Sequence, residues 1–181
     1  MNLSTLFRLG ENLNLDRKTL VFLRWIAILG QLFAINLVFF ALELEFPIFS
    51  AYLIISIGLI TNLFLQFGIK TIQLKDLYAS FFLTYDLIQL TILLYLTGGI
   101  SNPFSILLIV PAIVSSTFLS VGTTIILGLL TLIFLFILTI FHYPLPGIHE
   151  NSFTFPTYYL VGFFVAIIIG LVFLSYFGIR F

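Results

Sequence analysis

The sequence predicts an all-α fold: a polytopic transmembrane helical bundle with six spans and both termini in the cytoplasm. Only 8% of the 181 residues are charged and 61% are hydrophobic, with a mean hydropathy of +1.25, whereas a soluble domain has about 25% charged residues. Residues 87–149 contain no Asp, Glu, Lys or Arg. Because one helical span needs about 20 apolar residues, several spans must lie in that stretch.

The individual spans follow from cutting the hydrophobic sequence where charges, glycine or proline cluster. The first hydrophobic range follows basic residues, as in a signal peptide, but it is too long for a signal-peptide core and no small-residue cleavage site comes after it. We therefore predict a cytoplasmic N-terminal segment, residues 1–19, and a transmembrane domain, residues 20–181. The predicted spans of this domain are residues 20–42, 46–67, 77–97, 103–119, 121–142 and 157–177.

The break between the fourth and fifth predicted spans depends on length, because the turn around Ser120 carries no charge. A single helix over residues 103–142 would be about 60 Å long, roughly twice the hydrocarbon thickness of a bilayer. Two spans are therefore predicted. A re-entrant fourth segment is the alternative, and it would move Arg180 to the outer side.

The orientation follows from the positions of the charged residues. If the N-terminus is cytoplasmic, every basic residue falls on the inner side and the outer loops carry only acidic residues, as the positive-inside rule expects. The basic residues are Arg8, Arg17, Lys18, Arg24, Lys70, Lys75 and Arg180, and the outer acidic residues are Glu43, Glu45 and Glu150. We expect the lipid bilayer as a partner and no nucleic acid.

Asp86 lies about halfway along the third predicted span, with Gln89 three residues later. An ionised carboxylate at such a position costs roughly 2.5 to 3.5 kcal/mol on insertion scales, so Asp86 should face protein or a water-lined cavity. Two interpretations stay open: a ligand or proton site, or an interhelical hydrogen bond to a polar residue of the first two spans. The candidate partners for such a bond are Gln31, Asn36, Asn62 and Gln66.

The connection between the third and fourth spans, residues 98–104, has the sequence GGISNPF. A glycine can adopt the left-handed conformation that ends a helix, Asn102 can accept from free amides of the next helix, and Pro103 suits the first helical position. The dipole of that helix would favour a carbonyl oxygen, and Phe104 with Tyr95 could sandwich a flat ring. The alternative interpretation is a well-made hairpin without a ligand.

The other residues with potential chemical roles give weaker indications of function. Pro111 falls within the fourth span and predicts a kink, and Arg24 with Trp25 is interpreted as an interfacial anchor. Cysteine is absent, and His142 and His149 lack a known metal-ligand spacing. We therefore predict no metal site and no catalytic residue in this chain.

Several of these segments together resemble the membrane domain of RegB/PrrB-type redox-sensing histidine kinases. The likeness runs from about Leu20 to Phe177, and G-G-x-x-N-P-F is its most specific part. It is carried by residues 23–27 (LRWIA) with Gly30 and Gln31, by Asp86 and Gln89, and by residues 93–104 (LLYLTGGISNPF) with Pro111.

The resemblance implies a six-span sensor domain in the bacterial inner membrane, working as a homodimer. Its ligand would be ubiquinone, whose redox state controls a cytoplasmic kinase domain and, through it, a response regulator. The implied quinone-binding residues are Gly98, Gly99, Asn102, Pro103 and Phe104. Asp86 and Gln89 are possible polar neighbours without an implied role.

The chain departs from such kinases because it contains no phosphoacceptor-histidine helix and no ATP-binding domain. We therefore expect it to be a fragment or an orphan sensor whose kinase lies outside this chain. The alternative function is a small membrane transporter, or a transporter subunit, that uses Asp86 as a proton or coupling site. Transporters of that kind usually contain inverted repeats, and the sequence has none that we detect.

Overall fold

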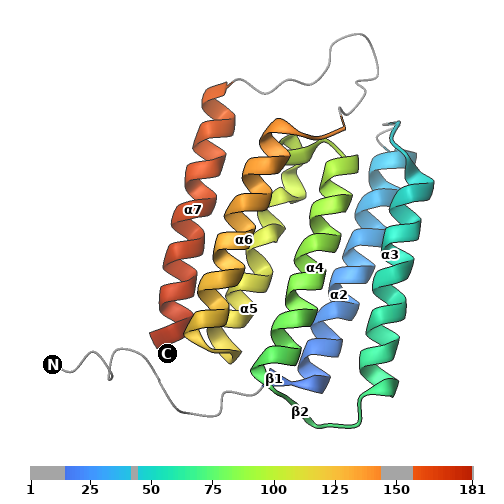
Figure 1. Cartoon of the computed structure of the whole chain (residues 1–181). Helices are drawn as coiled ribbons and strands as arrows, with labels where there is room; N and C mark the ends of the chain where they lie inside the picture. The colour runs from blue at the N-terminus through green and yellow to red at the C-terminus, as the bar shows by residue number, and fades with distance from the viewer. Residues whose placement is uncertain (1–14, 42–44, 144–156, 181) are drawn as a thin grey trace, which may run out of the picture.

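The computed structural model describes residues 15–41, 45–143 and 157–180, which form a bundle of helices (Figure 1). Apart from one pair of two-residue strands, the described chain is all-α. In chain order the elements are β1 (Leu15–Asp16), α2 (Arg17–Asn36) continued by a π-helical turn (Leu37–Ala41), α3 (Ile48–Leu63) continued by another (Phe64–Gly68), β2 (Gln73–Leu74), α4 (Asp76–Leu96), two 3₁₀ segments (Gly99–Ser101 and Pro103–Ile109), α5 (Val110–Phe118), α6 (Val121–Ile140) and α7 (Thr157–Arg180).

Each of the six predicted hydrophobic ranges contains one of the helices α2 to α7, with shifts of a few residues at the ends. Four of these helices are long and apolar enough to cross a membrane, and two shorter apolar helices, Pro103–Phe118 and Val161–Phe173, accompany them. The chain is thus a multi-pass membrane protein. Helix α2 begins at Arg17, three residues before the start of the first predicted span. Arg17 and Lys18 were placed outside that predicted span, although a helix can begin with charged residues.

The helices run alternately up and down, so the start of α2 and the end of α7 lie at the same end of the bundle as β1 and β2 (Figure 1). We call this the strand end. The connection from α4 to α5 lies at the opposite end, and we call its residues 98–104 the glycine turn. Figure 1 also places the end of α6 beside this turn.

The helix of the fourth predicted span has few residues, but it is longer than an α-helix with that number of residues. Its first seven residues are 3₁₀-helical and the next nine are α-helical, and rises of about 2.0 Å and 1.5 Å per residue give about 27 Å in total. The winding changes just before Pro111, and the Val110 N–H donates to the Leu107 carbonyl. That carbonyl is the one that Pro111 would leave without a donor in a continuous α-helix. A change of winding thus accommodates Pro111.

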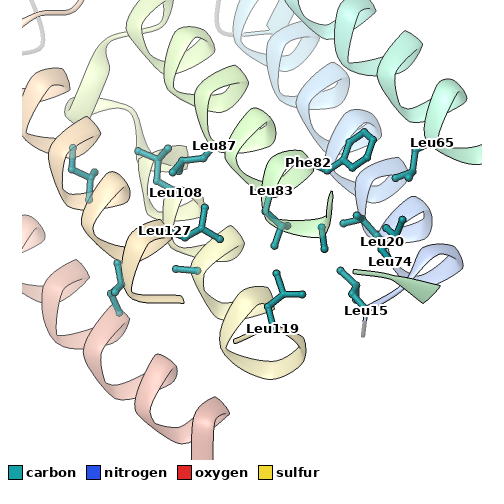
Figure 2. Packing of buried hydrophobic residues seen from close by; sticks show 14 of the residues in the cluster. Leu15, Leu20, Leu65, Leu74, Phe82, Leu83, Leu87, Leu108, Leu119 and Leu127 are labelled. Atoms are coloured by element: carbon teal, nitrogen blue, oxygen red, sulfur yellow. The ribbon is translucent and has the colours of Figure 1, made fainter. Parts of the chain in front are cut away.

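A leucine-rich core joins the strand end to the later helices (Figure 2). Leu15 and Leu74 from the two strands are 0% and 2% exposed, and they pack with Leu20 of α2. The cluster continues through α4 to Leu108 and Leu127. A smaller cluster packs α2 against α3. Many large apolar side chains point outward from these helices, as expected for surfaces that contact lipid.

Polar contacts fasten the strand end. β1 and β2 pair antiparallel, with Leu15 opposite Leu74, and the Arg17 guanidinium donates to the backbone carbonyls of Leu65 and Gln66 at the end of the α3 helix. The predicted break at Ser120 is present: α5 ends at Phe118 and α6 begins at Val121.

Asp76 at the start of α4 holds this uncharged break in place. Its carboxylate accepts from the Ser120 N–H at 2.8 Å, from the Ser120 hydroxyl at 2.9 Å and from the Thr123 hydroxyl at 2.6 Å. The charge that the turn lacks in sequence is therefore supplied by another helix.

Replacing Asp76 by Ala should destabilise the bundle. The change removes the acceptor of three hydrogen bonds, and bonds to a charged group contribute about 1.5–3 kcal/mol each when they are sheltered from water; because this site is only partly buried, we expect a total loss of about 1–3 kcal/mol. Thermal unfolding of the purified chain in detergent measures it. Lys75→Ala, at an exposed neighbouring position, is the control, and an equal effect of both changes would contradict the role of Asp76.

Candidate functional site

The glycine turn has the backbone geometry that its sequence predicts. Gly98 adopts the left-handed conformation (φ 101°, ψ 13°) directly after α4, and Gly99 also has a positive φ of 59°. Pro103 occupies the start of the next helix. Both glycines are buried and Pro103 is exposed. A left-handed backbone is costly for any residue with a Cβ, which explains the two consecutive glycines.

Asn102 organises this turn with its side chain. Its Oδ1 accepts from the Phe104 N–H at 2.9 Å, as predicted, while its Nδ2 donates to the carbonyl and the hydroxyl of Thr97 at 3.0 and 2.8 Å. The side chain therefore joins the last turn of α4 to the first turn of the following helix. Asn102 is only 7% exposed, so its amide serves the turn itself.

His142, just after α6, packs directly on Gly99. A Cβ on Gly99 would lie 2.6 Å from the Cβ and Cγ of His142 and 2.6 Å from the Leu138 carbonyl oxygen. The Tyr143 N–H donates to the Tyr95 carbonyl at 2.7 Å and ties the end of α6 to the end of α4. The His142 Nδ1 is buried and has no hydrogen-bond partner among the described residues. From the sequence, His142 was considered only as a metal ligand, and its position beside Gly99 was missed.

Several aromatic and apolar residues lie close to the turn in sequence or are joined to it through the end of α6. Phe104 is half-buried against the leucine core, while Tyr95 is 43% exposed and Tyr143 is 49% exposed. Ile106 and Leu107 on the next helix are exposed as well. Asn102 and the two glycines are thus buried, whereas Tyr95 and Tyr143 expose part of their side chains.

A second group of polar residues lies between α2, α3 and α4, and we call it the polar cluster: Arg24, Gln31, Thr61, Asp86 and Gln89. Arg24 forms an ion pair with Asp86, with its Nη2 and Nε at 2.8 and 2.9 Å from Oδ1. Its Nη2 also donates to the Thr61 hydroxyl at 2.8 Å. The rings of Phe82 and Tyr85 face the guanidinium at 5.3 and 5.6 Å.

The interpretation of Arg24 as an interfacial anchor was wrong. Its side chain is 3% exposed and points into the bundle, because Asp86 on α4 offers a partner that offsets the cost of burying the charge. The partners proposed for Asp86 in α2 and α3 did not include Arg24. One signal could have found the pair: an acid and a base inside predicted spans usually pair with each other.

Gln89 has one of the predicted partners, because its Nε2 donates to Gln31 Oε1 at 3.1 Å. Gly58 of α3 makes room for it: a Cβ there would lie 2.5 Å from the Gln89 amide atoms. Trp25 donates from its indole nitrogen to Gln66 Oε1 at 3.2 Å. These bonds and the ion pair link α2, α3 and α4 through polar side chains.

The remaining candidates from the sequence concern a metal site. His149 and Glu150 lie outside the described residues. Within the described ranges, no group of three or more His, Cys, Asp or Glu side chains could hold a metal ion.

The fold defines a helical, multi-pass membrane protein. Over 164 residues the chain is 35% identical to the sensor histidine kinase RegB of Cereibacter sphaeroides, a match that covers 90% of this chain and 36% of that protein. With the apolar helices, this match confirms the resemblance to the membrane domain of RegB-type sensor histidine kinases. The chain spans about a third of the length of this relative. No family model and no solved structure matches it.

Gly99→Ala should destabilise the glycine turn. Alanine at a positive φ costs about 1–2 kcal/mol, and its Cβ would also overlap His142 and the Leu138 carbonyl. We therefore expect a loss of about 2 kcal/mol or more, measured by thermal unfolding in detergent. Gly30→Ala is the matched control, because nothing lies within 4 Å of a Cβ there and alanine favours a helix. A neutral Gly99→Ala would contradict the described packing.

The ion pair predicts an asymmetric response to mutation. Asp86→Leu leaves the buried Arg24 charge without its partner and should cost about 3–5 kcal/mol. Arg24→Met should cost less, because an unpaired carboxyl group can take up a proton whereas a guanidinium stays charged. The double variant Arg24→Met/Asp86→Leu should recover most of the loss, since apolar residues often replace a buried pair without penalty. Thermal unfolding in detergent measures all three variants, and simple additivity of the single losses would contradict the pairing.

Proposed function

We propose that this chain is the membrane sensor module of a two-component redox-sensing histidine kinase and that it binds ubiquinone at the glycine turn. The observation that carries the proposal is the geometry of the turn. Two consecutive glycines have positive φ angles, the Asn102 side chain bonds Thr97 and the Phe104 N–H, and Pro103 begins the next helix, with Phe104 and Tyr95 close by in sequence. The similarity to RegB supports a sensor role. The cytoplasmic kinase domain and the response regulator belong to the proposal as partners.

The described contacts suggest which groups meet the quinone. The Asn102 amide is occupied within the turn, so Asn102 and the glycines shape the site while Phe104 and Tyr95 stack on the ring. His142 Nδ1, buried beside Gly99 without a partner among the described residues, is available to one quinone oxygen. An imidazole nitrogen can donate to a carbonyl or accept from a hydroxyl, so this residue would contact the oxidised and reduced ligand differently.

The same proposal includes six membrane crossings with both termini in the cytoplasm. At about 27 Å, the helix Pro103–Phe118 is close to the hydrocarbon thickness of about 30 Å, and α7 has 24 residues. Arg17, Lys75 and Arg180 all belong to the strand end, which favours that end as the cytoplasmic one. The bacterial inner membrane is the proposed location.

Signalling requires that oxidised and reduced quinone differ in affinity for two states of the module, because equal affinities shift no equilibrium. α4 and α7 both run between the glycine-turn end and the strand end (Figure 1). We assign the homodimer contact to α7: a Cβ added at Gly162 or Gly170 would have nothing within 4 Å among the described residues, and Ala166 between them is exposed. Their small side chains permit close approach of a second helix.

Photolabelling tests the binding site. A photoreactive short-chain ubiquinone analogue should label the peptide that contains residues 95–107 in the purified chain, and unlabelled ubiquinone should compete. Phe104→Ala removes the stacking ring, and Asn102→Ala removes the side-chain hydrogen bonds that join α4 to the next helix. We expect each change to weaken the competition by unlabelled ubiquinone about tenfold, or about 1.4 kcal/mol.

Phe136→Ala is the control for these variants, because this ring is 59% exposed on α6 and should have no part in the site. Labelling that is unchanged in both the Asn102 and Phe104 variants would overturn the site assignment.

The alternative of a transporter that uses Asp86 gains no support from the described contacts. Asp86 is held by two bonds from Arg24, so a coupling role would first require that ion pair to open.

A further inference from the structure

The polar cluster contains a hydrogen-bond donor that has no partner in the described part of the chain. Arg24 is 3% exposed, and its Nε and Nη2 are engaged by Asp86 and Thr61. Its Nη1 is also buried but has no hydrogen-bond partner among the described side chains and backbone atoms. In a membrane interior such a donor finds no bulk water and is costly to leave unpaired.

An unused acceptor lies on the neighbouring helix. Asn62 is 0% exposed, and its Oδ1 has no partner within the described part of the chain. Its Nδ2 approaches the Val21 carbonyl at 3.5 Å, so Asn62 lies about one helical turn before Arg24 along α2. Asn62 also follows Thr61, the partner of Nη2, so the unpaired donor and the unpaired acceptor both belong to the α2–α3 interface, about one helical turn apart.

The chemistry of these groups restricts the ligand. Arg24 and Asp86 together carry no net charge, so the site does not favour an anion. Phe82 and Tyr85 face the guanidinium and make the surroundings apolar. Nη1 needs an acceptor oxygen, and a carbonyl group supplies one without a charge.

We propose that Arg24, at the α2–α3 interface beside Asn62, forms a second binding site, for a neutral membrane-dissolved molecule whose carbonyl oxygen accepts from Arg24 Nη1. Two sources share this chemistry: the ring carbonyl of an isoprenoid quinone and the ester carbonyl of a lipid. The site is distinct from the glycine turn, because Asp86 lies ten residues before the end of α4 at Leu96, or about 15 Å along the helix. It therefore does not depend on the function proposed for that turn.

Trp25 provides a local probe. It is the only tryptophan in the chain, it is adjacent to Arg24, and its indole donates to Gln66 within the same interface. The test titrates the purified chain in an alkyl maltoside detergent, which lacks carbonyl groups, and follows Trp25 fluorescence. One arm adds a water-soluble ubiquinone analogue and the other adds short-chain phosphatidylethanolamine. A saturable change in the quinone arm identifies a quinone, and a saturable change in the lipid arm alone identifies a lipid ester.

The variants separate this site from its surroundings. Arg24→Met/Asp86→Leu should abolish the saturable change. Arg24→Lys keeps the charge but lacks Nη1, and should weaken the response by about tenfold or more even if the double variant fails to fold. Thr61→Val removes only a partner of Nη2 and should retain the response. Phe104→Ala, at the glycine turn, should also retain the fluorescence response. A negative result for ubiquinone binding at the glycine turn can therefore be distinguished from a negative result at Arg24.

Two results would overturn the proposal. If Trp25 fluorescence shows no saturable change in either arm, neither ligand binds at Arg24, and water is the partner of Nη1. A change of equal midpoint in wild type and Arg24→Lys would mean that Nη1 is not the donor.

Discussion

The hydrocarbon interior of a bilayer offers no water to polar groups, and this constraint organises the whole bundle. Apolar side chains cannot select neighbours strongly there, because lipid is as apolar as leucine. The polar residues therefore carry much of the specificity. Arg24 is the most demanding of them: its partners Asp86 and Thr61 come from two other helices, so one guanidinium requires α2, α3 and α4 to be adjacent.

Both ends of the bundle follow the same logic. At the strand end, Asp76 supplies acceptors to a turn that has no charge of its own. At the glycine turn, Asn102 uses both ends of its amide to hold α4 to the following helix. α4 takes part in all three of these features, with Asp86 between the two ends. α4 therefore joins the glycine-turn end to the strand end as one continuous helix.

Only part of the candidate site could be predicted from the sequence. Local geometry was predicted well, because the left-handed glycine, the Asn102 acceptor and Pro103 at the helix start are properties of a few consecutive residues. His142 beside Gly99 and the two-residue strands at Leu15 and Leu74 were not predicted. Each joins segments that are far apart in the chain, and no local pattern indicates which distant segment will be the neighbour.

The sequence by itself determined the membrane class, the helical ranges and the turn between α4 and α5, because hydrophobic length and local backbone preference act within short stretches. Only the tertiary structure decided what Arg24 does. Arg24 lies seven positions after the start of α2, and its long side chain could extend toward water. From the sequence we therefore predicted an interfacial anchor. The packing of α4 against α2 brought Asp86 within 2.8 Å, and a carboxylate at that distance in an apolar interior holds the guanidinium inside the bundle.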